Sequence, residues 1–352
     1  MYDNLFRHGD RTPSKREVYP NLPPNPIYDK LGYGELTDVG KKRAQDLGKM
    51  LRQRYDKFLG KAQYNEVYAI STDFDRTKMT LQLVLNGLYP PTKNASWDQM
   101  TWSPIPTLYL PLLLDTVLFP QACPIYVYEW LRLKFSDAMK KELDKYADLF
   151  QYLIQETGLT AKDNILLAAR LYQLLLSQRS MNMALPKWAT DKVQKALEQI
   201  VTLDYNIQSY TPKLKRLNGG TIVKRLLRNI RDKSSTAGSR RKIYLYSGHD
   251  VNIASFTKVN GFPEPTIPPY GSAFIVETWK TVAGKRYIQM YYWTGITEQL
   301  KPMKIPNCQE QCPLEEYEKL MQSLIPTDEE SACLWNTVTM KYLQEYYRLL
   351  EY

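Results

Sequence analysis

Two stretches in which short apolar strand patterns alternate with amphipathic helix patterns flank one long helical stretch of this sequence. The first holds the end of a strand at residues 4–7, a helix over 36–58 that Thr37 caps, a strand over 67–70 and a helix over 79–88. The second holds a helix over 219–230, a strand over 242–247 and two antiparallel strands over 273–279 and 287–293. Such alternation predicts a sheet with helices packed against it.

Between these stretches, from residue 108 to 214, the apolar periodicity is helical and no strand pattern occurs; residues 138–155 and 162–176 are examples. The predicted fold class is therefore α/β, with a mixed, mostly parallel sheet flanked by helices and an inserted all-helical cap. We expect an α/β core domain of residues 1–107 and 215–352, and a cap of residues 108–214. Ligands bind such sheets beyond the carboxyl ends of the strands.

The composition excludes several classes of protein. Of the 352 residues, 43% are hydrophobic and 24% are charged, which is typical of a globular chain and argues against a disordered or fibrous one. The most apolar stretch, residues 108–119, is interrupted by Pro111 and Asp115. It is too short to cross a bilayer, which takes about 20 residues, so we expect no membrane span.

The formal net charge of +10 makes nucleic-acid binding a class to consider. The basic residues are spread along helical stretches such as 41–57, and the only dense basic run is 240–242. We therefore expect a solvated basic surface and no nucleic-acid partner. A net positive field still concentrates small anionic substrates near the protein.

The chain has only two histidines, and each directly follows a predicted strand. His8 lies in the segment RHGDRTP, with Arg7 on one side and Arg11 on the other. Arginine is the side chain best suited to hold phosphate oxygens at two points at once. A hydrogen-bonded structural histidine is the alternative for a lone histidine, but the flanking arginines favour an anion site.

Two further segments follow predicted strands. His249 is followed by Asp250, whose carboxyl group can donate a proton. Residues 71–77 open a helix, so backbone N–H groups and Arg76 are placed to meet an anion. We interpret Asp73 and Asp75 as residues that stabilise the start of that helix.

Together, residues 7–13, residues 71–77 and the Gly-His-Asp triplet at 248–250 resemble the histidine acid phosphatases, in branch 2 of the histidine phosphatase superfamily. The resemblance extends over nearly the whole chain and includes animal prostatic and lysosomal enzymes. Residues 75–85 and 242–255 are most similar to insect venom acid phosphatases. The family implies a core like that of phosphoglycerate mutase. An RHGxRxP motif with a later HD pair is a specific signature, whereas RHG alone is a weak one.

The resemblance implies a metal-independent hydrolase of phosphate monoesters that needs no cofactor. His8 would be the nucleophile that forms a phosphohistidine, and Asp250 would protonate the leaving oxygen. The residues implied to hold the phosphoryl oxygens are Arg7, Arg11, Arg76 and His249. Phosphoryl transfer asks mainly for positioning and for neutralised charge, which arginines supply. An acidic optimum is expected because Asp250 must hold a proton.

Other functions remain open at this point. A phytase-like or a lysophospholipid phosphatase specificity fits the same site. A mutase activity is less favoured, because an Asp directly after the second His matches the phosphatase and phytase branches. From a different class, a secreted binding or antigenic protein with this fold and little turnover is favoured by one feature: few residues precede His8, and Asp3 and Asn4 are poor residues for a buried strand.

The four cysteines, Cys123, Cys308, Cys312 and Cys333, permit three pairings. A zinc site is the alternative, but no histidine lies near them in the sequence, so we favour disulfides formed in an oxidising compartment. A glycosylation sequon at Asn94 fits the same compartment, whereas the chain starts without an apolar signal segment.

The short spacing of Cys308 and Cys312 makes a local ring easy to close. Together with the resemblance, it implies the pairs Cys308–Cys312 and Cys123–Cys333. The resemblance also implies a secreted or lysosomal protein, and related animal enzymes suggest a homodimer.

Overall fold

The computed structural model describes residues 1–60, 64–90, 104–159, 163–234, 240–296 and 300–333. Its central sheet has the strand order β3-β2-β4-β1-β5-β6-β7, with β8 paired to β6. The strands that run parallel to one another are β1 (Tyr2–Arg7), β2 (Val67–Ser71), β3 (Leu108–Tyr109) and β4 (Ile243–Gly248). The strands that continue the sheet in antiparallel fashion are β5 (Ala273–Lys280), β6 (Arg286–Trp293), β7 (Lys301–Met303) and β8 (Cys312–Pro313). The predicted mixed α/β fold is confirmed.

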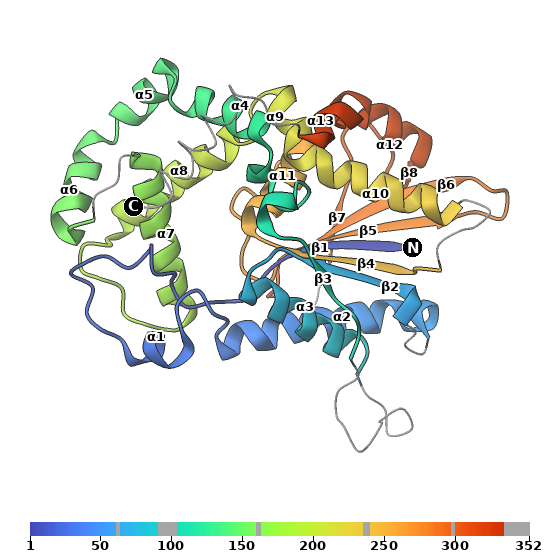
Figure 1. Cartoon of the computed structure of the whole chain (residues 1–352), viewed down its shortest axis with the longest axis horizontal. Helices are drawn as coiled ribbons and strands as arrows, with labels where there is room; N and C mark the ends of the chain where they lie inside the picture. The colour runs from blue at the N-terminus through green and yellow to red at the C-terminus, as the bar shows by residue number, and fades with distance from the viewer. Residues whose placement is uncertain (61–63, 91–103, 160–162, 235–239, 297–299, 334–352) are drawn as a thin grey trace.

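Helices cover both faces of this sheet (Figure 1). On one face lie α2 (Asp38–Leu59) and α3 (Asp75–Leu88), and on the other lie α10 (Gly219–Ser234), α11 (Asp250–Val259) and α12 (Leu314–Met321). Alternating side chains of β1 serve the two layers: Phe6 packs with the α2–α3 cluster and Leu5 with the opposite cluster. Thr37 caps α2 as predicted, since its side chain accepts a hydrogen bond from Gly40 N.

A separate group of helices lies beyond the carboxyl ends of the parallel strands (Figure 1). Its members are α4 (Pro124–Lys134), α5 (Asp137–Asp144), α6 (Ala147–Thr157), α7 (Asn164–Ser180), α8 (Asp191–Ile207) and α9 (Pro212–Leu217). These helices, which we call the cap, have a hydrophobic cluster of their own that Tyr19 and Cys333 join from outside. Two short α-helices, α1 (Pro26–Leu31) and α13 (Asp328–Ala332), lie outside these groups. The domain boundaries at residues 107 and 215 remain a prediction.

Two local expectations for the helical stretch are wrong. Residues 108 and 109 form β3, which pairs with the end of β2, although no strand was expected there. A two-residue strand is too short to leave a periodic signal. The expected helix over 138–155 is divided into α5 and α6, because Tyr146 adopts φ −107° and ψ 10°, which is outside helical geometry.

The first strand lies in the middle of the sheet despite its polar residues. β1 lies between β4 and β5, with Tyr2 opposite Ile243 and Arg7 opposite Gly248 in the parallel pairing. Asp3 is buried, and its Oδ1 accepts a 2.6 Å hydrogen bond from Asn229 Nδ2 on α10. A buried polar group is tolerated when it has such a partner, so Asp3 fits this strand, while Asp3 Oδ2 and Asn4 Oδ1 are buried without a hydrogen-bond partner in the described structure.

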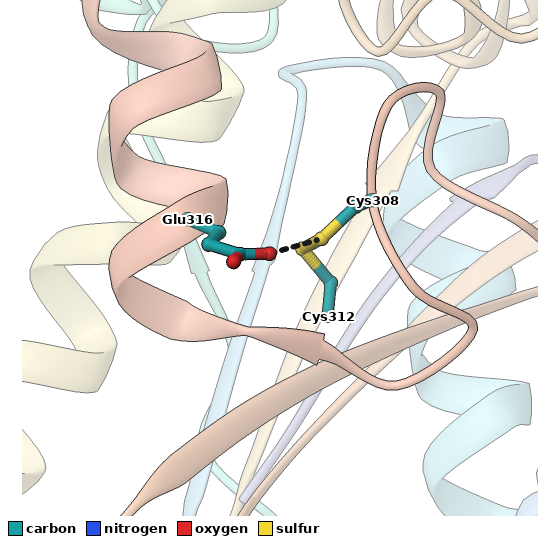
Figure 2. Close-up of side chains that lie close together, drawn as sticks. All are labelled: Cys308, Cys312 and Glu316. Carbon is teal, nitrogen blue, oxygen red and sulfur yellow. Dashed lines mark hydrogen bonds between the residues drawn. A yellow bond between two sulfur atoms is a disulfide. The ribbon is translucent and has the colours of Figure 1, made fainter.

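The four cysteines form the two disulfides Cys123–Cys333 and Cys308–Cys312. The first joins the start of α4 in the cap to the residue after α13. Figure 2 shows the second, with Glu316 Oε2 at 3.4 Å from Cys308 Sγ. Because the two sulfurs are bonded to each other, this cluster offers no thiolate to a metal ion. Asn94 lies outside the described residues. Within those residues, no helix combines the length and apolar character that a membrane span requires.

Candidate active site

The predicted site residues meet at one edge of the sheet. β2, β4 and β1 are neighbours and run in the same direction, so their carboxyl ends lie side by side. His8 follows β1, residues 72–76 follow β2, and His249 follows β4. Backbone hydrogen bonds connect the three ends: His8 N donates to Gly248 O at 3.0 Å and Thr72 N donates to Ser247 O at 3.1 Å.

The turn after β1 is held against the start of α2. A Cβ atom on Gly9 would lie 2.3 Å from Gly40 O, so only glycine permits this close approach. Thr37 N donates to Asp10 O at 3.0 Å, and Asp10 forms a 2.6 Å ion pair with Arg43 of α2. These contacts fix the backbone on which His8 is carried.

His8 is buried and is held as a neutral ring with one defined tautomer. Its Nδ1 lies 2.8 Å from Gly9 O, which can only accept, so Nδ1 carries the proton and Nε2 keeps its lone pair. Burial, followed by the charges of Arg76 and Arg7, holds the pKa of His8 well below its usual value. A neutral imidazole with a free Nε2 has the form that a nucleophile requires.

Arg7 is almost fully buried at the end of β1. Its Nη1 donates to Pro268 O at 2.6 Å, and its guanidinium group lies 4.1 Å from the centre of the Tyr270 ring. Its Nη2 forms a 2.9 Å ion pair with Asp250 Oδ2. Backbone, aromatic and carboxylate contacts therefore fix this cation without a ligand.

Arg11 is held by a carboxylate that the sequence analysis missed. Glu17 Oε1 and Oε2 accept from Arg11 Nη2 and Nη1 at 2.7 and 2.8 Å, which is a bidentate pair. Glu17 Oε2 also accepts from Ser14 N at 2.8 Å. Glu17 therefore offsets one of the positive charges in the site and leaves the Arg11 side chain little freedom.

Arg76 is the arginine of the site that has no carboxylate partner among the described residues. Its guanidinium group lies 4.5 Å from the centre of the Phe74 ring, and its Nη2 lies 3.5 Å from His249 Nδ1. Burial and the nearby charge of Arg11 lower the pKa of Arg76 to about 10. It remains a cation at any acidic or neutral pH, and an anion would relieve this repulsion.

Each of the three arginines has a buried hydrogen-bond donor without an acceptor. In each of Arg7, Arg11 and Arg76, the Nε atom is buried and has no hydrogen-bond partner in the described structure. Buried N–H donors normally have an acceptor. All three cations also lower the pKa of His8, so they lie close around its ring.

His249 occupies the N-cap position of α11. Its ring lies 5.5 Å from the His8 ring, its Nε2 is 2.9 Å from Thr72 Oγ1, and its backbone N donates to Asn252 Oδ1 at 2.9 Å. Burial and the charge of Arg76 hold the pKa of His249 well below its usual value. His249 is therefore neutral, and it faces the same space as His8.

Asp250 is surrounded by hydrogen-bond donors. Besides Arg7, Gln173 Nε2 donates to its Oδ2 and Val251 N donates to its Oδ1, both at 2.9 Å, and Tyr205 forms a further side-chain hydrogen bond. Burial by itself would raise the pKa of this carboxyl group, but Arg7 and the hydrogen-bond donors outweigh it and lower the pKa. Without a ligand, Asp250 is ionised.

The aspartates after β2 have different roles. Asp75 lies in the first turn of α3, as expected, where a negative charge is favourable. Asp73 instead forms an ion pair with Lys78. Phe74 occupies the N-cap position of α3 without a side-chain hydrogen bond.

The sequence analysis missed Glu17, Gln173, Tyr205 and Ser177, whose Oγ donates to Arg11 O at 2.8 Å. Glu17 had a weak signal, because it lies six residues after Arg11 in the same loop. The other three belong to cap helices, where no motif distinguishes them from neighbouring polar residues.

The sequence pattern of the histidine phosphatase superfamily (branch 2) matches residues 3–293. Venom acid phosphatase Acph-1 of Apis mellifera is 38% identical over 339 residues, which cover 94% of this chain and 86% of that protein. Human prostatic acid phosphatase is 30% identical, with 94% and 86% coverage, and Xenopus laevis lysosomal acid phosphatase is 32% identical, with 94% and 77% coverage.

Among solved structures, a Hafnia alvei phytase in complex with tartrate matches 95% of this chain and 98% of its own, with a TM-score of 0.68 and 18% identity. At that identity the likeness shows the fold alone. The full-length matches to acid phosphatases and the match of the family pattern agree with the motifs that meet at the sheet edge. The chain therefore belongs to branch 2 of the histidine phosphatase superfamily.

Proposed function

We propose that the protein is an acid phosphatase that hydrolyses phosphate monoesters through a phosphohistidine. The observation that carries this proposal is the neutral His8, with its free Nε2, inside a group of three arginines whose buried Nε donors lack partners. A phosphoryl group offers the oxygen acceptors that these donors need, and its charge is neutralised by the guanidinium groups.

In the first step, His8 Nε2 attacks phosphorus and a new P–N bond replaces the bond to the leaving oxygen. Arg7, Arg11, Arg76 and His249 hold the phosphoryl oxygens, and Asp250 gives its proton to the leaving alkoxide. In the second step, water attacks phosphorus and releases His8. The Asp250 carboxylate takes the proton of that water, so the enzyme returns to its starting state.

The state of Asp250 explains an acidic optimum. Its pKa is lowered in the free site, chiefly because Arg7 overcomes the effect of burial. A bound phosphoryl group brings negative charge and competes for Arg7, and both effects raise the pKa of Asp250. Low pH favours the protonated acid, while His8 stays neutral because its own pKa is held well below the usual value.

Acid phosphatase activity is preferred to the alternatives on two grounds. The relatives with 30–38% identity are named acid phosphatases, whereas the phytases match in fold at 17–18% identity. A binding protein with little turnover was favoured only by a weak first strand, and β1 is paired on both sides, with its residues from Asp3 to Arg7 buried.

A secreted or lysosomal location is part of the proposal. It is supported by the two disulfides and by the venom and lysosomal relatives.

We also propose a homodimer that forms along the β3 edge of the sheet. Leu108, Tyr109 and Leu110 are exposed there, and an exposed apolar edge strand is a surface suited to pair with a second copy. Light scattering during gel filtration tests the dimer, and Leu108→Lys should give monomers.

The proposed activity is tested with para-nitrophenyl phosphate at pH 5, with and without vanadate. Wild-type protein should turn over the ester, vanadate should inhibit it, and rapid quenching with labelled substrate should trap phosphate on the protein. His8→Ala should remain folded and trap no phosphate, because the other imidazole of the site, His249, has both ring nitrogens engaged by Thr72 and Arg76. Near-normal rates in His8→Ala would refute the assignment of the nucleophile.

A further inference from the structure

A residue of the cap contacts both a phosphate-holding arginine and the proposed acid. Gln173 lies on α7, 166 positions from Arg7 and 77 positions from Asp250 along the chain. Its Oε1 accepts from Arg7 Nη2 at 3.3 Å, and its Nε2 donates to Asp250 Oδ2 at 2.9 Å. Arg7 Nη2 lies 2.9 Å from the same Oδ2. The three side chains thus form a closed triangle of contacts.

The chemistry of its partners fixes the orientation of the Gln173 amide. A guanidinium group only donates and an ionised carboxylate only accepts. Turning the amide over would place an N–H group against Arg7 and a carbonyl oxygen against Asp250. Oδ2 of Asp250 therefore accepts from two groups that can only donate, so neither of its lone pairs is left for a proton. Oδ1 accepts from Val251 N at 2.9 Å, and the remaining partner of Asp250, the Tyr205 hydroxyl, can turn to accept. The proton required by the reaction is therefore better placed on Oδ1.

Charged and titratable groups face Asp250 from every element packed around it. From the sheet side and the loops after its strands come Arg7, Arg11, Arg76 and His249. From the cap helices and the loop before β5 come Tyr172, Asp204, Tyr205 and Tyr270. Gln173 is uncharged, so its effect on Asp250 comes from the hydrogen bond and is separable from these charges by substitution.

We propose that Gln173 is a positioning residue for the general acid: it directs the proton of Asp250 to Oδ1 and sets the pH range over which Asp250 carries that proton. The inference rests on the proposed function, because it takes Asp250 to be the acid. A donor to Oδ2 stabilises the ionised carboxylate, so Gln173 keeps proton donation confined to acidic solution. The cap thereby controls a step carried out by residues of the core.

Two substitutions separate this role from a structural one. Gln173→Glu replaces the donor by a second carboxyl group, which still accepts from Arg7 but favours a shared proton with Asp250. Gln173→Ala removes both contacts. Gln151→Glu is the matched control, because it adds the same charge to the cap at an exposed residue of helix α6.

The measurement is kcat/KM for glycerol 2-phosphate divided by kcat/KM for para-nitrophenyl phosphate, from pH 3 to 8. The alkyl ester needs protonation of its leaving oxygen and the aryl ester needs little, so the ratio reports the protonation state of Asp250. Ionisation of the phosphate group affects both esters, so the ratio reduces its contribution. In wild type the ratio should be highest at low pH and should fall as the pH rises. We call this fall the limb of the pH profile. The limb should shift to higher pH by about 1 unit in Gln173→Glu and by about 0.5 unit in Gln173→Ala. It should lie at the same pH in Gln151→Glu as in wild type.

An unchanged limb in both Gln173 variants overturns the inference, even if their melting temperatures fall, since that combination is the signature of a purely structural residue. Wild-type turnover of both esters would in that case leave the phosphatase function standing. A wild-type protein that hydrolyses neither ester overturns both proposals. If Gln173→Glu does not fold, the Gln173→Ala limb decides.

Discussion

At the residue scale, Asp250 combines two demands that oppose each other. The proposed reaction needs its proton, whereas Arg7 and the donors around it lower its pKa in the free site. We expect Asp250→Asn to slow hydrolysis of glycerol 2-phosphate by about 100-fold or more, and of para-nitrophenyl phosphate by about tenfold or less. The alkyl leaving group needs a proton far more than the activated aryl group does. Steady-state kinetics on both esters make the comparison, and equal losses would identify Asp250 as structural.

Glu17 gives a second prediction at this scale. Glu17→Gln preserves the size of the side chain but breaks the bidentate pair with Arg11, which leaves a buried cation unpaired. We expect a loss of about 3 kcal/mol of stability. Inorganic phosphate should then raise the melting temperature more in Glu17→Gln than in wild type. In the variant the phosphate is not repelled by a Glu17 carboxylate, and it pairs with the Arg11 cation.

The matched control for Glu17 is Glu66→Gln. Glu66 pairs with Lys242 at 2.9 Å just before β2, at the end of the strand opposite the site. Its substitution should leave the phosphate-induced shift unchanged. Equal shifts in Glu17→Gln and wild type would show that Glu17 does not oppose anion binding.

At the scale of an element, β1 carries a buried carboxyl group whose pKa burial raises to about 7. In the unfolded chain this group titrates near 4, so the folded state binds the extra proton between those values. Stability from Asp3 is therefore fully present below about pH 4 and is lost as the pH rises to about 7. The full difference is on the order of 4 kcal/mol. Because of this group, the folded state is more stable in acid, where the proposed phosphatase is active, than at neutral pH.

Asp3→Asn tests this account of β1. The amide oxygen still accepts from Asn229, but no proton is gained or lost. Urea unfolding from pH 4 to 8 should show wild type losing stability relative to Asp3→Asn as the pH rises. Asp38→Asn, at an exposed position of α2, should follow wild type. Parallel curves for wild type and Asp3→Asn would mean that Asp3 is ionised in the folded strand.

At the scale of the whole molecule, the Cys123–Cys333 disulfide ties the cap to the C-terminal part of the described chain across a separation of 210 positions. In the chain-entropy model, so long a closed loop stabilises the fold by up to about 5 kcal/mol, although measured effects are often smaller. We expect Cys123→Ala with Cys333→Ala to lower the melting temperature more than Cys308→Ala with Cys312→Ala, whose bond closes a separation of 4.

Thermal unfolding of the two double variants makes this comparison, after non-reduced peptide mapping of wild type has verified both bonds. Equal or reversed losses would indicate that loop length does not govern their contribution. Free thiols at all four positions in wild type would contradict the oxidising compartment as well.

The sequence by itself determined the α/β class, most strand and helix positions, and the motif residues at the strand ends. This was possible because periodicity marks the strands, and because the carboxyl ends of neighbouring parallel strands must lie together. His8, Arg76 and His249 therefore meet although up to 241 positions separate them, from residue 8 to residue 249.

Tertiary structure alone decided which polar residues pair across the molecule. Gln173 contacts Asp250 because cap helix α7 lies beside the loop after β1 and the start of α11, and Asp3 is tolerated because α10 brings Asn229 to it. Neither pair leaves a local pattern, since a hydrogen bond between distant segments depends on side-chain geometry and not on spacing along the chain. The motifs thus identify the groups to which we assign the reaction, while packing of the cap sets the environment of these groups.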